Sequence, residues 1–181
     1  DTGPGGGIVF YIAPTTFTQV DATGPMCTTN CKYLEAAPIS GTDAWIRAAY
    51  EWSGDTTSAV GVNAQGTAIG TGYKNTLAMI AQNNTEGRAG TISQAYRGPN
   101  HLSDWYLPSK DELAQLYDQR DEVGLGGDIL WSSTEAGSIC RSRDDSTFDP
   151  PTEACAKRFS NGNNSNRVKY GSNYVRPIRA F

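Results

Sequence analysis

The sequence predicts a single α+β domain spanning residues 1–181, in which short antiparallel strands accompany two main helices. Its patterning begins with one apolar strand, continues through helical stretches and ends in several short strands, the order of an α+β fold. A chain of 181 residues with 38% apolar side chains is long enough to bury a core. Strands and helices do not alternate regularly, so we expect no doubly wound nucleotide-binding fold.

The chain opens with a glycine-rich turn that leads into a strand. Residues 1–7 read DTGPGGG, a composition typical of tight turns. Residues 8–12 (IVFYI) are a continuous apolar and β-branched run, which predicts a buried strand. Residues 13–32 are rich in Thr, Pro and Gly, and we predict a loop there.

The first main helix is predicted shortly before the middle of the chain. Four apolar side chains fall on one helical face between Gly72 and the asparagines at 83–84, namely Tyr73, Leu77, Ile80 and Ala81. The preceding residues 44–52 have a weaker pattern, which predicts a short helix or a turn.

The second main helix has the clearest start signal in the sequence. Ser109 is a good N-cap, and Glu112 three residues later completes a capping box. Apolar side chains then share one face up to Tyr117, and Gly124 is predicted to end the helix.

The rest of the chain is predicted to form short strands, at residues 129–135, 154–159, 167–170 and 174–181. Pro177 lies inside the last of them and cannot donate a ladder hydrogen bond, so that strand is expected at an edge or a bulge.

Neither glycine-rich segment has the context of a phosphate-binding loop. Residues 3–7 precede a strand, whereas a phosphate loop follows one and opens a helix. Residues 66–72 do lead into a helix, but they lack the Lys and hydroxyl pair of a P-loop. We therefore expect neither a nucleotide cofactor nor a nucleic-acid partner.

The sequence offers little material for catalysis or for a metal site. His101 is the only histidine, and although Asp104 is near, no nucleophile is placed beside it. The adjacent acids Asp111 and Glu112 are explained by the helix dipole. We predict no catalytic residue, no cofactor and no metal. Core packing is the favoured role, ahead of stacking on sugars, for Trp45, Trp52, Trp105 and Trp131.

The four cysteines predict two disulfides and an extracellular protein. Their spacing makes Cys27 with Cys31 and Cys140 with Cys155 the natural pairs, although four cysteines allow three connectivities. A zinc site is less favoured, because fourteen residues between the latter two are too many for a knuckle. No apolar run approaches the roughly 20 residues that span a bilayer, so we expect no membrane insertion.

Basic residues are concentrated at the end of an otherwise acidic chain. Residues 1–140 hold 7 Lys and Arg against 15 Asp and Glu, whereas residues 141–181 hold 8 against 4. Arginine forks match sulfate and carboxylate geometry, so we predict an anion-binding surface there. The predicted contacts are Arg141, Arg143, Lys157, Arg158, Arg167 and Lys169.

Two alternatives remain for this basic tract. It can be a solvated strand face balanced by nearby acids such as Asp144 and Glu153. The Asn-, Ser- and Tyr-rich residues 160–174 can instead be a diversified loop that binds proteins. Arg176 and Arg179, which flank Pro177, are expected to be structural and buried against acids.

Six ordered motifs resemble a bacterial domain family typified by the C-terminal domain of the Legionella collagen-like adhesin. They read DTGPGGGIVFY, YLEAAP, GTAIGTGYKNT, DWYLPSKDEL, WSSTE and YVRPIRAF, and together they span nearly the whole chain. The resemblance implies a divergent C-type-lectin-like fold, related to formylglycine-generating enzymes and to the variable proteins of diversity-generating retroelements.

The resemblance also implies a function. The family's ligands are sulfated glycosaminoglycans such as heparin, and its collagen-like stalk implies a homotrimer at the bacterial surface or secreted, in host attachment. The calcium-binding signatures of sugar-binding C-type lectins are absent, and so are the catalytic cysteines of formylglycine-generating enzymes. We therefore expect a non-catalytic adhesin domain without calcium-dependent monosaccharide binding.

Overall fold

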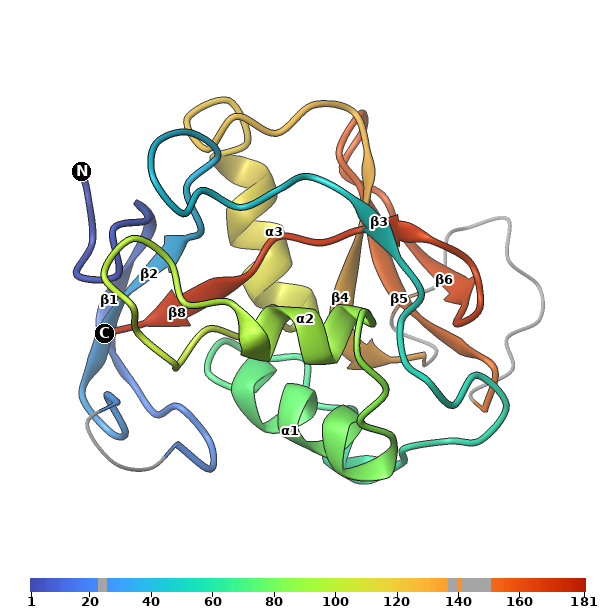
Figure 1. The fold of residues 1–181 in the computed structure, drawn as a ribbon. Helices are drawn as coiled ribbons and strands as arrows, with labels where there is room; N and C mark the ends of the chain where they lie inside the picture. The colour runs from blue at the N-terminus through green and yellow to red at the C-terminus, as the bar shows by residue number, and fades with distance from the viewer. Residues whose placement is uncertain (23–25, 137–139, 141–150) are drawn as a thin grey trace.

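The computed structural model describes residues 1–22, 26–136, 140 and 151–181. Within them, the strands form two sheets, and the helix α3 packs against strands of both (Figure 1). The strands are β1 (Ile8–Phe17), β2 (Cys31–Ala36), β3 (Ala49–Tyr50), β4 (Ile129–Glu135), β5 (Glu153–Arg158), β6 (Asn164–Val168), β7 (Asn173–Tyr174) and β8 (Ile178–Ala180). The helices are η1 (Val62–Ala64), α1 (Gly72–Gln82), α2 (Ala89–Ala95) and α3 (Lys110–Asp118). The predicted α+β fold is confirmed.

The smaller sheet joins the two ends of the chain. Its strand order is β1-β2-β8, with antiparallel pairing throughout, and both termini lie beside it (Figure 1). The predicted loop at residues 13–32 is wrong at both ends, because β1 continues to Phe17 and β2 begins at Cys31. The β1–β2 ladder has two register shifts, and the one between Ile12 and Phe17 accommodates the Thr- and Pro-containing part of β1.

The larger sheet has the order β3-β7-β4-β5-β6, in which β4 and β7 are parallel and the other pairs are antiparallel. β4 has the bounds predicted for it, and β5 differs by one residue at each end. The helix or turn expected at residues 44–52 is wrong, since β3 lies there and pairs with β7.

The predicted terminal strand at 174–181 is divided between the two sheets. β7 belongs to the larger sheet and β8 to the smaller one, and Pro177 lies in the segment between them. The Pro177 carbonyl accepts a hydrogen bond from the Ala37 N–H at 2.9 Å. The proline therefore stands where the chain leaves one sheet and enters the other.

The capping box of α3 forms as predicted. Ser109 Oγ accepts a hydrogen bond from the Glu112 N–H, and the Ser109 N–H donates to Glu112 Oε2 at 2.8 Å. The helix ends at Asp118, earlier than the predicted Gly124, and turns fill the interval. α1 also forms at its predicted place, whereas α2 was not predicted.

The tryptophans pack in the core, as expected. Trp52, Trp105 and Trp131 are fully buried and Trp45 nearly so. Each indole N–H donates to a backbone carbonyl: that of Trp52 to Ser132, Trp105 to Arg97, Trp131 to Tyr50 and Trp45 to Val175. None of the helices in the described part of the chain has the length and apolar character needed to cross a bilayer.

Candidate functional site

The glycine-rich N-terminus forms a cradle for one of the chain's own carboxylates. Glu35 is fully buried in β2, and its two oxygens accept hydrogen bonds from the N–H groups of Gly5 and Gly7, each at 2.8 Å. A Cβ at Gly7 would collide with the Ala36 carbonyl oxygen, so the close approach requires glycine. The predicted tight turn is confirmed, and its anion site is filled internally.

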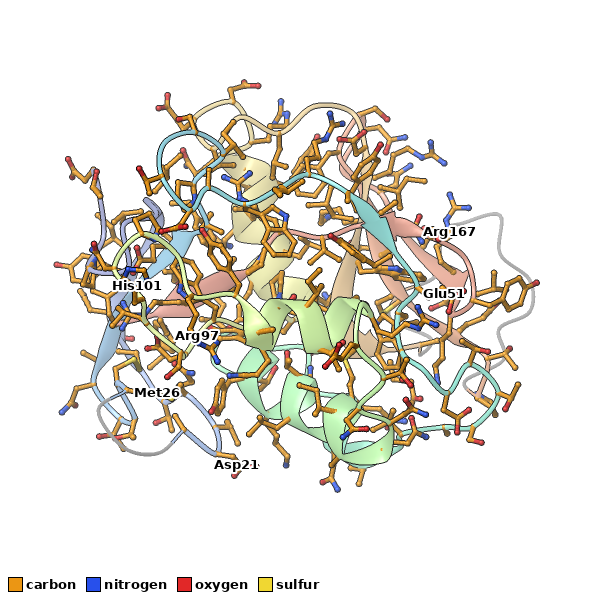
Figure 2. The ribbon with its side chains drawn as sticks, viewed as in Figure 1. Asp21, Met26, Glu51, Arg97, His101 and Arg167 are labelled. Atoms are coloured by element: carbon orange, nitrogen blue, oxygen red, sulfur yellow. A yellow bond between two sulfur atoms is a disulfide. The ribbon has the colours of Figure 1, made fainter. Side chains whose placement is uncertain are left out.

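Arg179 is buried against acids, as predicted. Its Nη1 lies 2.8 Å from Glu35 Oε1, and its Nε lies 2.6 Å from Asp104 Oδ1. His101 is exposed (Figure 2), while the neighbouring Asp104 serves this arginine. The carboxylate that a histidine-based relay would need is therefore engaged in a structural network.

Lys169 is not available to a ligand, which corrects the prediction that it is a contact. Its side chain is fully buried, and Nζ lies 2.7 Å from Glu135 Oε1. The same ammonium donates to the carbonyls of Ser58 and Pro151. Glu135 in turn accepts the N–H groups of Val60 and Gly61, so the ion pair anchors the loop before η1.

Lys157 is also a structural residue rather than a free surface cation. Its exposed fraction is 6%, and Nζ donates to the Gly162 carbonyl at 2.7 Å. Nζ lies 5.3 Å from the centre of the Tyr117 ring, and burial lowers the pKa of this lysine. The ammonium therefore closes the β5–β6 turn against α3.

Two predicted contacts lie near opposite ends of the β5–β6 ladder. Ala154 pairs with Arg167 and Ala156 with Ser165, so the alternation of strand side chains places Arg158 and Arg167 on the same side as these two alanines. Because Ala154 and Ala156 are buried in the core, the two arginines reach solvent only at the ends of the ladder. Arg158 is exposed and Arg167 is half-buried at the edge strand (Figure 2). Neither forms an ion pair with any described residue. The predicted contacts Arg141 and Arg143 lie outside the described residues.

The recognition-loop alternative covers a segment that is partly committed to the sheet. Residues 160–174 contain the β5–β6 turn, β6 and β7, and within them Asn166 and Lys169 are buried. Tyr170 is 64% exposed, and Asn161 and Asn163 are exposed in the turn. A diversified loop could therefore vary without loss of stability only at the few exposed positions of this segment.

A separate pocket of about 500 Å³ opens beside β7. Three segments far apart in sequence build it, and most of its lining is aliphatic or aromatic. Its lining includes Trp45, Ile46, Arg47, Asp128, Tyr174 and Arg176. The pocket could not be predicted from the sequence, because these residues share no spacing or motif.

The rim of the pocket carries an ion pair. Arg47 contacts the Asp128 carboxylate, and its guanidinium lies 4.7 Å from the centre of the Tyr174 ring. Trp45 is held by the hydrogen bond from Nε1 to the Val175 carbonyl, and the edge of Tyr96 packs on it at 5.3 Å. The two aromatic walls therefore have fixed orientations.

Arg176 lines the same pocket and is 1% exposed. It is buried as predicted, but no described carboxylate pairs with it, which corrects the expected acid partner. One guanidinium nitrogen, Nη2, donates to the Val123 carbonyl at 3.1 Å, and Nε has no hydrogen-bond partner. Burial lowers the pKa of Arg176 to about 10, so it remains charged at neutral pH.

Each of the two disulfides joins cysteines that follow one another in the sequence, which are the pairs that their spacing favours. The Cα atoms are 5.3 Å apart in Cys27–Cys31 and 5.5 Å apart in Cys140–Cys155. The second bond fixes Cys140 to β5, which lies between β4 and β6 in the larger sheet. Across the described residues, His, Cys, Asp and Glu form no group of three or more that could hold a metal ion.

A scan against protein-family models finds no match for this chain, and a search of curated proteins finds none either. Its function is therefore inferred from its own residues and their geometry.

Proposed function

We propose that this chain is a non-catalytic extracellular adhesin domain that binds sulfated glycosaminoglycans through the basic side chains of β5 and β6 that reach solvent. The observation that carries the proposal is that Arg158 and Arg167, on these two paired strands, have no ion-pair partner among the described residues. A guanidinium fork matches a sulfate group in geometry and charge, and remains protonated at any physiological pH.

The proposed surface is smaller than the sequence alone indicates. Of the six predicted contacts, Lys157 and Lys169 are removed by burial. Arg158 and Arg167 remain, together with Arg141 and Arg143, which belong to the same stretch of sequence after Cys140. The motif resemblance to the collagen-like adhesin family supports a sulfated ligand, and by that resemblance we further propose a homotrimer, testable by native mass measurement.

The absence of catalysis is part of the proposal. Three buried glutamates are the strongest candidates for acid–base chemistry in the fold, and each accepts two backbone N–H groups and one side-chain donor. The side-chain donors are Arg179 for Glu35, Tyr106 for Glu112 and Lys169 for Glu135. Carboxylates with these partners anchor loops, because their hydrogen bonds are made within the protein.

Heparin chromatography across a salt gradient tests the proposal. We expect the wild-type domain to be retained at low salt and released as salt rises, because each captured sulfate displaces counterions. The double variant Arg158→Glu/Arg167→Glu should be released at clearly lower salt with an unchanged circular dichroism spectrum.

Arg97→Glu is the matched control for the single variant Arg167→Glu, since each reverses one charge and Arg97 is exposed at the other side of the molecule from Arg167 (Figure 2). It should lower retention much less than Arg167→Glu. Equal loss in the two single variants would indicate a nonspecific charge effect, and absence of wild-type retention at low salt would contradict heparin binding itself.

A further inference from the structure

We infer that the pocket beside β7 is a second binding site, for a small organic acid whose single carboxylate pairs with Arg176 and whose apolar body lies between Trp45 and Tyr174. This site is distinct from the proposed polysaccharide surface. None of the four predicted basic contacts that the structure describes lines the pocket.

The first argument is the uncompensated charge of Arg176. Arg179, three residues away, is buried with two carboxylates, Glu35 and Asp104. Arg176 is buried more completely, yet its described partners are one backbone carbonyl and no carboxylate. Tyr96, which interacts electrostatically with Arg176, is a neutral phenol because burial raises its pKa to about 12. A buried charge without a counter-ion is costly, so an anion that enters the pocket would relieve that cost.

The second argument is the apolar lining. Ile39, Ile46, Leu125, Leu130 and Val175 surround the two aromatic walls, and the volume of about 500 Å³ falls within the range of small-molecule sites. Ile46 is 78% exposed at the pocket and has no apolar cover in the isolated chain. An apolar ligand body would remove it from water.

The third argument fixes the charge of the ligand. The Arg47 guanidinium is already paired with Asp128, so the rim adds no net charge. The pocket therefore offers one uncompensated positive charge, which favours a monoanion over a sulfate diester chain or a phosphate dianion. A planar guanidinium can donate two parallel hydrogen bonds to one carboxylate.

Isothermal titration calorimetry with 4-phenylbutyrate and its neutral isostere 4-phenylbutanamide tests the assignment. We expect the acid to bind at least about tenfold more tightly than the amide, because a hydrogen bond to a charged group is worth about 1.5–3 kcal/mol. In ¹⁵N-labelled protein, the Trp45 indole N–H signal should shift with the same saturation curve. Equal affinity for acid and amide, or no saturable binding, would overturn the assignment.

Two variants separate ligand binding from folding. Arg176→Met keeps the side-chain volume and should remove the preference for the acid while leaving the domain folded, because replacing a buried ion by an apolar residue is often neutral. Ile46→Asp changes an exposed side chain and should abolish acid binding by like-charge repulsion. Val62→Asp is its matched control, since Val62 is 80% exposed outside the pocket.

Heparin retention distinguishes this site from the proposed function. Ile46→Asp should leave heparin retention close to that of Val62→Asp, while only Ile46→Asp loses 4-phenylbutyrate. Undiminished binding of 4-phenylbutyrate to a folded Arg176→Met variant would contradict the inference. If Arg176→Met does not fold, undiminished binding to Ile46→Asp would contradict it.

Discussion

At the scale of single residues, the sequence of this domain misleads about where its positive charge lies. Of the basic residues in the described part of the tract, four are buried: Lys157, Lys169, Arg176 and Arg179. Long aliphatic stems let Lys and Arg pack in a core while their charged ends reach acceptors. Gly162, which accepts from Lys157, is five residues away, but the acceptors of Lys169, Arg176 and Arg179 are distant in sequence. Composition alone therefore could not distinguish an internal anchor from a surface contact.

Lys169→Met tests whether this lysine is an anchor. The change leaves Glu135 buried without its counter-ion, so we expect the free energy of unfolding in urea to fall by about 3–5 kcal/mol. The double variant Lys169→Met/Glu135→Gln removes both charges and should recover part of that loss. A single variant as stable as the wild type would show that the ion pair is not needed.

At the scale of elements, sequence signals succeeded where they are local. The capping box of α3 and the apolar runs of β1 and β4 are read from consecutive residues, and all three form where they were predicted. β2 was missed because it contains the buried Glu35, whose partners lie in the N-terminal turn and in β8. β3 and α2 have two and seven residues, too few for a periodic pattern to emerge.

The buried cap residue of α3 gives the element a dependence on pH. Burial raises the pKa of Glu112 to about 7 from its usual 4.5, against the opposing effect of its hydrogen bonds. Between these values the folded state binds more protons than the unfolded state, so stability falls as pH rises and levels off above about 7. We expect this carboxyl to lower the unfolding free energy by up to about 3 kcal/mol from pH 4.5 to pH 8.

Urea unfolding at several pH values checks this dependence. Glu112→Gln cannot accept from both Ser109 and Gly70, so it should be less stable overall, but its stability should vary less between pH 4.5 and pH 8 than that of the wild type. An identical pH profile in both proteins would mean that Glu112 stays ionised throughout.

At the scale of the whole molecule, the C-terminal segment connects the two sheets and supplies one wall of the pocket. β7 contributes Tyr174 to the pocket, and the segment between β7 and β8 contributes Val175 and Arg176. β8 then joins the smaller sheet, beside which both termini lie. The sequence motif YVRPIRAF indicated a strand and a structural arginine. It could not indicate a pocket, because the opposite wall comes from residues 39–47 and 124–130, which approach only in the folded chain.

The disulfide on β5 tests how far the larger sheet depends on a covalent link. Cys140 and Cys155 are separated by 15 positions, and closing a loop of that length stabilises a fold by about 3 kcal/mol through the entropy of the unfolded chain. Cys140→Ala/Cys155→Ala should therefore lower the melting temperature by about 6–12 °C for a domain of this size. The Cys27–Cys31 disulfide closes a shorter loop of 4 positions, so Cys27→Ala/Cys31→Ala should lower the melting temperature less. The reverse ranking would mean that the strain or packing at each bond, rather than loop length, determines its contribution.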